Sequence, residues 1–245
     1  MNTQSTIEKM KQLKLFGMSE IYHRSLTEHL FTSHTTDEFL ALLVDTEWDR
    51  RENRKIENLR KSAGFKFHAE ASNMDYTTQR NLDKTVFERL LTLQFIKQRE
   101  NLIITGPSGI GKSFLAQAIG QSAVKNLFKT SYFNTGKLNE EIKLSKIQGH
   151  YIKFLKKIQH CDLLIMEDFG LHTLDNHTRQ ALFDIVEERH DRRSTIITSQ
   201  FPVKTWHEII GESTIADAIL DRLVFNSHRI ELNGDSMRKK KKLKG

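Results

Sequence analysis

The sequence predicts an α/β domain with a five-stranded parallel sheet covered by helices on both faces, preceded by a small all-helical domain. Five short apolar runs after residue 100 alternate with longer stretches of helical periodicity, which is typical of parallel strands buried on both faces. No strand-like alternation precedes residue 100, and only two prolines interrupt the 245-residue chain.

The helices of the first domain are predicted from apolar spacing and end signals. Residues 7–13 and 18–30 have the spacing of two short helices. A longer helix is expected to start at Thr36 or Asp37, either of which can cap it, and to stop at Gly64.

The later elements follow from the apolar runs and the periodic stretches between them. The expected strands are residues 102–105, 130–134, 163–166, 195–198 and 229–232. The expected helices are residues 113–128, 136–148, 151–158, 175–190 and 214–225. The expected parts of the chain are a helical domain that binds DNA or a partner (1–65), a polar linker (66–80), the α/β domain (81–232) and a basic tail (233–245).

Composition excludes several classes of protein. A single cysteine, Cys161, excludes a disulfide scaffold and fits a reducing compartment. No apolar run approaches the ~20 residues that cross a bilayer, so we expect a soluble cytoplasmic protein without a membrane partner. The net charge is +7, and six basic groups lie in the last eight residues, a pattern that favours polyanions or simply solubility.

The strongest motif is a glycine-rich run that follows an expected strand and opens an expected helix. It matches G-x-x-x-x-G-K-[ST], in which backbone amides surround phosphate oxygens, the lysine reaches the β- and γ-phosphates, and the hydroxyl ligates Mg²⁺. We therefore expect a bound nucleoside triphosphate. The run consists of Gly106, Pro107, Ser108, Gly109, Ile110, Gly111, Lys112 and Ser113.

Two adjacent carboxylates, Glu167 and Asp168, end the expected strand at residues 163–166. Because neighbouring residues of a strand point to opposite sides, one carboxylate can face a metal's water shell while the other faces the γ-phosphate. The alternative is an acidic turn after a buried strand.

Two further polar positions gain meaning only from this context. Gln200 and Thr198 lie at the end of the fourth expected strand, where a polar group can position the attacking water, although such endings are often plain strand termini. Arg222 lies within an otherwise apolar helix, where the alternative is an ion pair involving Asp221.

The order of P-loop, acidic strand end, polar strand end and Asp-Arg helix resembles the AAA+ ATPases. Several stretches resemble more narrowly the IstB-like ATPases, transposition helper proteins of bacterial insertion sequences that are related to the DnaC helicase loaders. The resemblance covers nearly the whole chain. The stretches are residues 13–18, 101–106, 112–119, 162–171 and 221–238.

The resemblance implies roles at matching positions. Lys112 would bind phosphate, Ser113 and Glu167 would hold Mg²⁺, and Asp168 would act as catalytic base. Gln200 would be the polar sensor, with Thr198 as competitor. Arg222 would act as an arginine finger toward a neighbouring subunit, and Arg238 as a second sensor arginine. The acidic pair departs from the usual order, Asp then Glu, so the base is one methylene shorter and hydrolysis is expected to be slow.

A basic stripe on the long helix is a candidate surface for DNA. With 100° per residue its members fall within an arc of ~140°, opposite Trp48, Ile56, Leu59 and Ala63. The alternative is a solvated helix face. The stripe consists of Arg50, Arg51, Arg54, Lys55 and Lys61.

These features together predict an ATPase that uses ATP and Mg²⁺, assembles on double-stranded DNA as a homo-oligomeric ring or filament, and presents that DNA to a transposase. A DnaC-like loader, which prefers single-stranded DNA and binds a replicative helicase, is the nearest alternative. A small-molecule P-loop kinase and a scaffold that does not hydrolyse ATP are two more.

Overall fold

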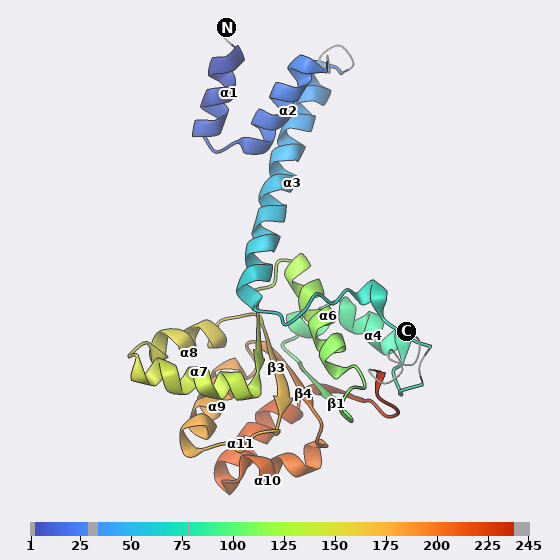
Figure 1. Ribbon diagram of the computed structural model, residues 1–245, viewed down its shortest axis with the longest axis vertical. Coiled ribbons are helices and arrows are strands. Elements are labelled where there is room, and N and C mark those ends of the chain that lie inside the picture. The colour runs from blue at the N-terminus through green and yellow to red at the C-terminus, as the bar shows by residue number, and fades with distance from the viewer. Residues whose placement is uncertain (1–2, 29–33, 78, 238–245) are drawn as a thin grey trace. The chain divides into compact units, whose positions relative to one another are not determined.

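The computed structural model describes residues 3–28, 34–77 and 79–237 (Figure 1). The chain forms two compact units, Met1–Asn58 and Leu59–Gly245. None of the helices in the described ranges is long and apolar enough to cross a membrane.

The first unit is helical. It contains α1 (Thr3–Gln12), α2 (Phe16–Thr27) and most of α3 (Thr36–Ala63). Gly17 lets α2 approach α3 closely, because a Cβ there would lie 2.8 Å from the carbonyl oxygen of Thr46.

Helix α3 begins with a reciprocal cap that the sequence interpretation placed one or two residues too late. The cap is Thr35, since its hydroxyl accepts from the backbone N–H of Glu38, while the Glu38 carboxylate accepts from the backbone N–H of Thr35 at 2.7 Å. Thr36 and Asp37 lie inside the helix, where Asp37 and Glu38 favour the positive end of the helix dipole.

The apolar face of α3 is more exposed than its periodicity suggests. Leu43 is buried, but Leu40, Val44 and Trp48 are 56%, 46% and 68% exposed. Trp48 therefore does not pack, which corrects the expected contrast between an apolar and a basic stripe at this position.

The second unit contains the predicted parallel sheet. The strand order is β2-β3-β4-β1-β5, and every pair of neighbours is parallel. The strand that precedes the glycine-rich run thus lies between β4 and β5. The strands are β1 (Asn101–Thr105), β2 (Thr130–Asn134), β3 (Leu163–Phe169), β4 (Ser194–Ser199) and β5 (Ser227–Glu231).

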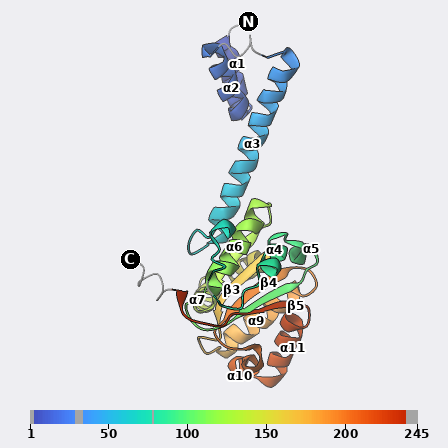
Figure 2. The ribbon, with the colours of Figure 1, turned by 90° about the vertical axis from the view of Figure 1, so that its right-hand side faces the viewer.

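Helices cover both faces of the sheet, as predicted (Figures 1 and 2). Alternate strand residues enter two cores: Ile104 packs in the one that includes α4 and α6, and Ile103 in the one that includes α7, α9 and α11. The helices are α4 (Lys84–Leu91), α5 (Gln94–Lys97), α6 (Lys112–Lys125), α7 (Thr135–Ile147), α8 (Tyr151–Gln159), α9 (Asn176–Arg189), α10 (Trp206–Ile210) and α11 (Ser213–Val224), with short 3₁₀ turns at Ala71–Asn73 and Val203–Thr205.

Residues 66–80, expected to be a linker, include several that pack against the second unit. The side chain of Gln117 on α6 accepts the backbone N–H groups of Lys66 and Phe67 at 2.9 and 3.2 Å. Ala69 and Met74 belong to the core beneath α6. The described part of this segment is therefore held by the domain that follows it.

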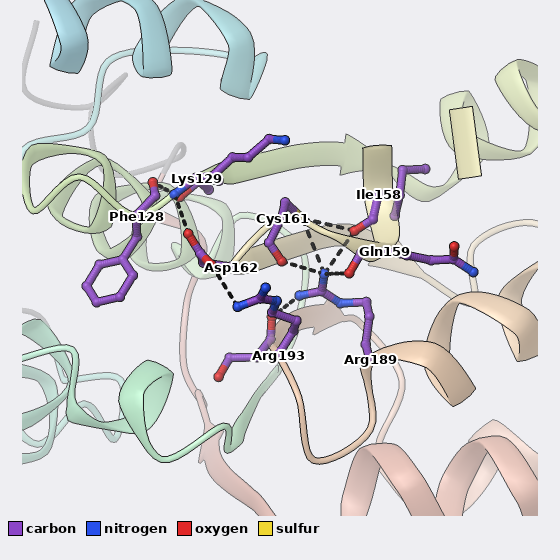
Figure 3. Close-up of polar contacts among 10 residues, drawn as sticks. Phe128, Lys129, Ile158, Gln159, Cys161, Asp162, Arg189 and Arg193 are labelled. Carbon is purple, nitrogen blue, oxygen red and sulfur yellow. Dashed lines mark hydrogen bonds and ion pairs between the residues drawn. The ribbon is translucent and has the colours of Figure 1, made fainter. Parts of the chain in front are cut away.

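The amino ends of β3 and β4 meet at a buried arginine (Figure 3). Arg189, at the end of α9, is 2% exposed. Its guanidinium donates to the carbonyl oxygens of Ile158 and Cys161 at 2.9 and 2.8 Å, to that of Ser194, and to the hydroxyl of Thr195. Main-chain groups thus surround this charge.

Candidate nucleotide-binding site

The glycine-rich run forms the turn between β1 and α6. Gly106, Gly109 and Gly111 have φ values of 141°, 79° and 109°, which side chains other than glycine rarely adopt. A Cβ on Gly106 would lie 2.3 Å from the carbonyl oxygen of Leu232. The backbone is thereby shaped as a cradle at a helix N-terminus, which suits a phosphate anion.

Lys112 closes over this cradle. Its ammonium donates to the carbonyl oxygens of Gly106 and Pro107 at 2.6 and 2.9 Å, and the residue is 5% exposed. Two carbonyl oxygens of the loop therefore bind the ammonium group that is predicted to bind the phosphates.

Glu167 lies at the carboxyl end of β3 and is buried, at 2% exposure. The hydroxyl of Tyr132 on β2 donates to its carboxylate. The pKa of Glu167 is raised overall, and burial is the largest cause. A hydrogen bond from Ser113 acts against this effect, while the charge of Asp168 adds to it. Smaller effects of Lys66 and Lys112 lower the pKa. The structure thus brings Ser113 and Glu167, the two residues predicted to hold Mg²⁺, into contact with each other.

Asp168 does not continue the strand alternation. Its φ is +61°, in the left-handed region, and the register between β3 and β4 shifts between Met166 and Phe169. Such bulges re-aim side chains at strand ends. Asn134 Nδ2 donates to the Asp168 carboxylate at 3.0 Å, so the second carboxylate, like the first, has a partner on β2.

The two sensor candidates differ in their surroundings. Thr198 is fully buried, and its hydroxyl accepts from the backbone N–H of Asp168 at 3.3 Å. Gln200 follows the end of β4 and is partly exposed. The structure therefore brings Thr198, the competitor, into contact with the acidic pair. Arg238 lies outside the described residues.

Arg222 lies on α11 and pairs with a helix on the same face of the sheet. Its Nε lies 2.6 Å from a carboxylate oxygen of Glu187 on α9, and Nη1 donates to the carbonyl oxygen of Ala218. The ion-pair partner is therefore Glu187, not Asp221. The Arg222 side chain is 24% exposed.

Three residues of the site were not predicted. Tyr132 and Asn134 lie on β2, whose apolar pattern gave no sign that it faces the acidic pair. Arg80 lies beneath the glycine-rich run, where Nη1 donates to the carbonyl oxygen of Ile110 at 3.0 Å. An arginine in a segment interpreted as a linker carries no sequence signal for this position.

The basic stripe of α3 contains two residues that form ion pairs within the helical unit and three that are exposed. Arg50 pairs with Glu20 at 3.1 Å, and Arg51 pairs with the buried Glu47 at 2.7 Å. The other three members are exposed along the helix; they are Arg54, Lys55 and Lys61.

The strand order and the cradle at the end of β1, next to an acidic pair at the end of β3, define an AAA+ P-loop NTPase. The chain belongs to the IstB-like ATP binding protein family, whose model matches residues 8–245.

Similar proteins agree with this assignment. An insertion-sequence ATP-binding protein of Sinorhizobium fredii is 39% identical over 239 residues, 98% of each chain. Among solved structures, the fold resembles DnaI, with a TM-score of 0.58 and 21% identity over 68% of this chain and 92% of that chain. It also resembles the DnaC helicase loader, with a TM-score of 0.50 and 19% identity over 72% and 99%.

Proposed function

We propose that the chain hydrolyses ATP, assembles on double-stranded DNA while ATP is bound, and assists the transposase of an insertion sequence. The observation that carries hydrolysis is the acidic pair beside Ser113, with each carboxylate oriented from β2 by Tyr132 or Asn134. The relatives' description as insertion-sequence ATP-binding proteins supports the transposase as partner.

Each residue of the site has a defined task in this proposal. Lys112 binds the β- and γ-phosphates, and the hydroxyl of Ser113 together with Glu167 holds Mg²⁺, which neutralises charge on the phosphates when bound. Asp168 accepts the proton of the attacking water. Thr198 orients the backbone of Asp168, and Gln200 is left to contact the water or the γ-phosphate.

Arg222 is proposed to act on the ATP of an adjacent subunit. A guanidinium offers planar donors to the charge that develops on the γ-phosphoryl oxygens, but here it must first leave Glu187. Arg222→Ala should bind ATP and lose hydrolysis by up to about 10³-fold. Mixing it with Lys112→Ala should restore part of the rate, because mixed interfaces pair an intact ATP site with an intact arginine.

Glu187→Gln is the matched variant for this test. It keeps the helix surface but releases the arginine, so the rate should be at least that of the wild type. If Arg222→Ala assembles normally and mixing restores nothing, Arg222 serves only the ion pair with Glu187.

The DNA contact is assigned to the exposed residues of the basic stripe. Replacing Arg54, Lys55 and Lys61 by alanine should weaken duplex binding on every sequence alike. The slope of log affinity against log salt should flatten by roughly 0.9 per lost phosphate contact. Hydrolysis without DNA should persist.

A control with the same loss of charge uses basic side chains on α4 and α5. An equal loss of affinity in stripe variant and control would mean that net charge alone acts. The control replaces Lys84, Arg89 and Lys97.

Electron microscopy with ATP on duplex and single-stranded DNA, followed by a strand-transfer assay with the transposase, tests the whole proposal. We expect ATP-dependent assemblies on duplex DNA and stimulated strand transfer. Assembly on single-stranded DNA alone, with no effect on transposase, would instead indicate the helicase loader.

A further inference from the structure

Arg80 is a buried arginine in contact with the P-loop. The residue is 3% exposed, and its guanidinium lies next to Gly111 of the phosphate-binding turn. Nη1 donates to the carbonyl oxygen of Ile110 at 3.0 Å, and Nη2 donates to the carbonyl oxygen of Asp75 at 2.7 Å. The P-loop is thus tied to a segment that precedes β1 by more than twenty residues.

The guanidinium lies close to the backbone of the P-loop. A Cβ on Gly111 would lie 2.4 Å from Nη1, so only glycine leaves room for the arginine at this point of the loop. The backbone carbonyl of Arg80 accepts from the N–H of Asn233, after β5, at 3.1 Å. Arg80 therefore contacts three parts of the chain: the P-loop, the segment before β1 and the segment after β5.

Among the described residues, the charge of Arg80 is not matched by a carboxylate in direct contact, and one of its nitrogens has no partner. Within the described ranges no carboxylate forms an ion pair with it, and its Nε is buried without a hydrogen-bond partner. Burial lowers the pKa of the guanidinium, while the more distant carboxylate of Asp75 partly offsets this effect. A buried guanidinium with one nitrogen left without a partner is incompletely satisfied, unlike that of Arg189, whose three nitrogens all donate.

We propose that Arg80 is a positioning residue of the nucleotide site, and that the bound triphosphate supplies the counter-charge it lacks. By donating to the Ile110 carbonyl, Arg80 holds this oxygen where it does not repel the phosphate oxygens that the loop amides bind. Its charge then acts on the phosphates at a distance, without contact. The inference rests on the proposed ATP site.

The proposal predicts a dependence on ligand charge. Electrostatic attraction grows with the number of phosphate charges, so losing Arg80 should weaken ATP more than ADP. A role confined to holding the loop would weaken both nucleotides alike.

Calorimetric titration of Arg80→Met and Arg80→Lys with ATP and with ADP tests this. Arg80→Met should bind ATP about 10- to 100-fold more weakly, the range for losing a hydrogen bond from a charged group. ADP should be affected less, and Arg80→Lys, which keeps the charge but not the fork, should fall between Arg80→Met and wild type. Thermal unfolding without nucleotide checks that each variant folds, and Arg80→Lys carries the test if Arg80→Met does not.

Arg99→Met is the matched control, because Arg99 is exposed and also donates to a main-chain carbonyl, that of Asp191, at 3.1 Å. It should bind both nucleotides as the wild type does. ATP affinity within about twofold of wild type in a folded Arg80 variant, or equal losses for ATP and ADP, would overturn the inference. Failure of the wild type itself to bind ATP would instead refute the site.

Discussion

The two ends of the same sheet treat buried charge in opposite ways. At the amino ends of the strands, Arg189 is enclosed by the carbonyl oxygens of Ile158, Cys161 and Ser194 (Figure 3). At the carboxyl ends, Arg80 has a buried nitrogen without a partner, and the pKa of the buried Glu167 is raised.

This difference separates structural from functional charge. A buried ion that the chain satisfies by itself stabilises the fold and leaves nothing for a ligand to add. One that is left incomplete costs stability until a ligand of opposite charge completes it, which is how binding sites are set apart from the core.

The largest effect is expected at Asp168. Asp168→Asn should keep ATP bound but lower the hydrolysis rate about 10²- to 10⁴-fold, because an amide does not accept the water's proton. Phosphate release under single-turnover conditions measures this. A normal rate in Asp168→Asn, together with a blocked Glu167→Gln, would exchange the roles of the two carboxylates.

At the amino ends of the strands, Arg189→Met should lower the stability of the fold without affecting ATP binding. Its removal takes a donor from three carbonyl oxygens, of which that of Ile158 still accepts from Cys161 Sγ. At about 1–3 kcal/mol for each of the other two, the free energy of unfolding should fall by about 2 kcal/mol or more. Denaturant unfolding measures the loss. The folded fraction should bind ATP with wild-type affinity, and weaker intrinsic binding would break the contrast between the two ends.

Tyr132 is predicted to act on the metal through Glu167. Tyr132→Phe keeps the ring and removes the hydroxyl that donates to the carboxylate. Partners of metal ligands typically contribute 10- to 100-fold to metal affinity, so the Mg²⁺ concentration that half-saturates ATP binding should rise about tenfold. Binding without Mg²⁺ should not change, and Tyr151→Phe on α8 is the control. An unshifted Mg²⁺ midpoint would leave Tyr132 with a packing role.

Glu47 in the helical unit extends the comparison to a carboxylate that the chain satisfies itself. Burial alone would raise its pKa, but hydrogen bonds from Arg51 and from the backbone N–H groups of Gly17 and Met18 outweigh burial and lower the pKa. The stabilisation is therefore present above the ordinary carboxyl pKa and is lost as the pH falls through the folded value. Thermal unfolding of Glu47→Gln should show a deficit of about 1–2 kcal/mol near pH 7 that shrinks below about pH 4. A deficit that is constant with pH would mean that the charge of Glu47 does not contribute.

The sequence predicted the strands and the two main motifs of the site. Apolar runs located all five strands to within a few residues, because strands buried on both faces need continuous apolar sequence. The P-loop and the acidic pair were found because phosphate and metal chemistry restrict the residue types at fixed spacing.

What the sequence did not reveal depends on tertiary contact. The left-handed backbone of Asp168 arises from the register shift between β3 and β4, to which no residue type points. Trp48 has helical spacing but is 68% exposed, and periodicity does not show which residues of an apolar stripe are covered. The contact of Arg80 with the P-loop joins positions thirty residues apart, which local patterns do not encode.

The central claim is that a triphosphate binds at the carboxyl ends of the strands. Its most direct test is calorimetric titration of ATP with Mg²⁺ into the wild type and into Lys112→Ala, with thermal unfolding of both proteins as a check on folding. The account predicts one ATP per wild-type chain and no measurable binding to a Lys112→Ala protein that unfolds at the wild-type temperature. Equal affinity in the two proteins would contradict it, since the triphosphate would then lie elsewhere.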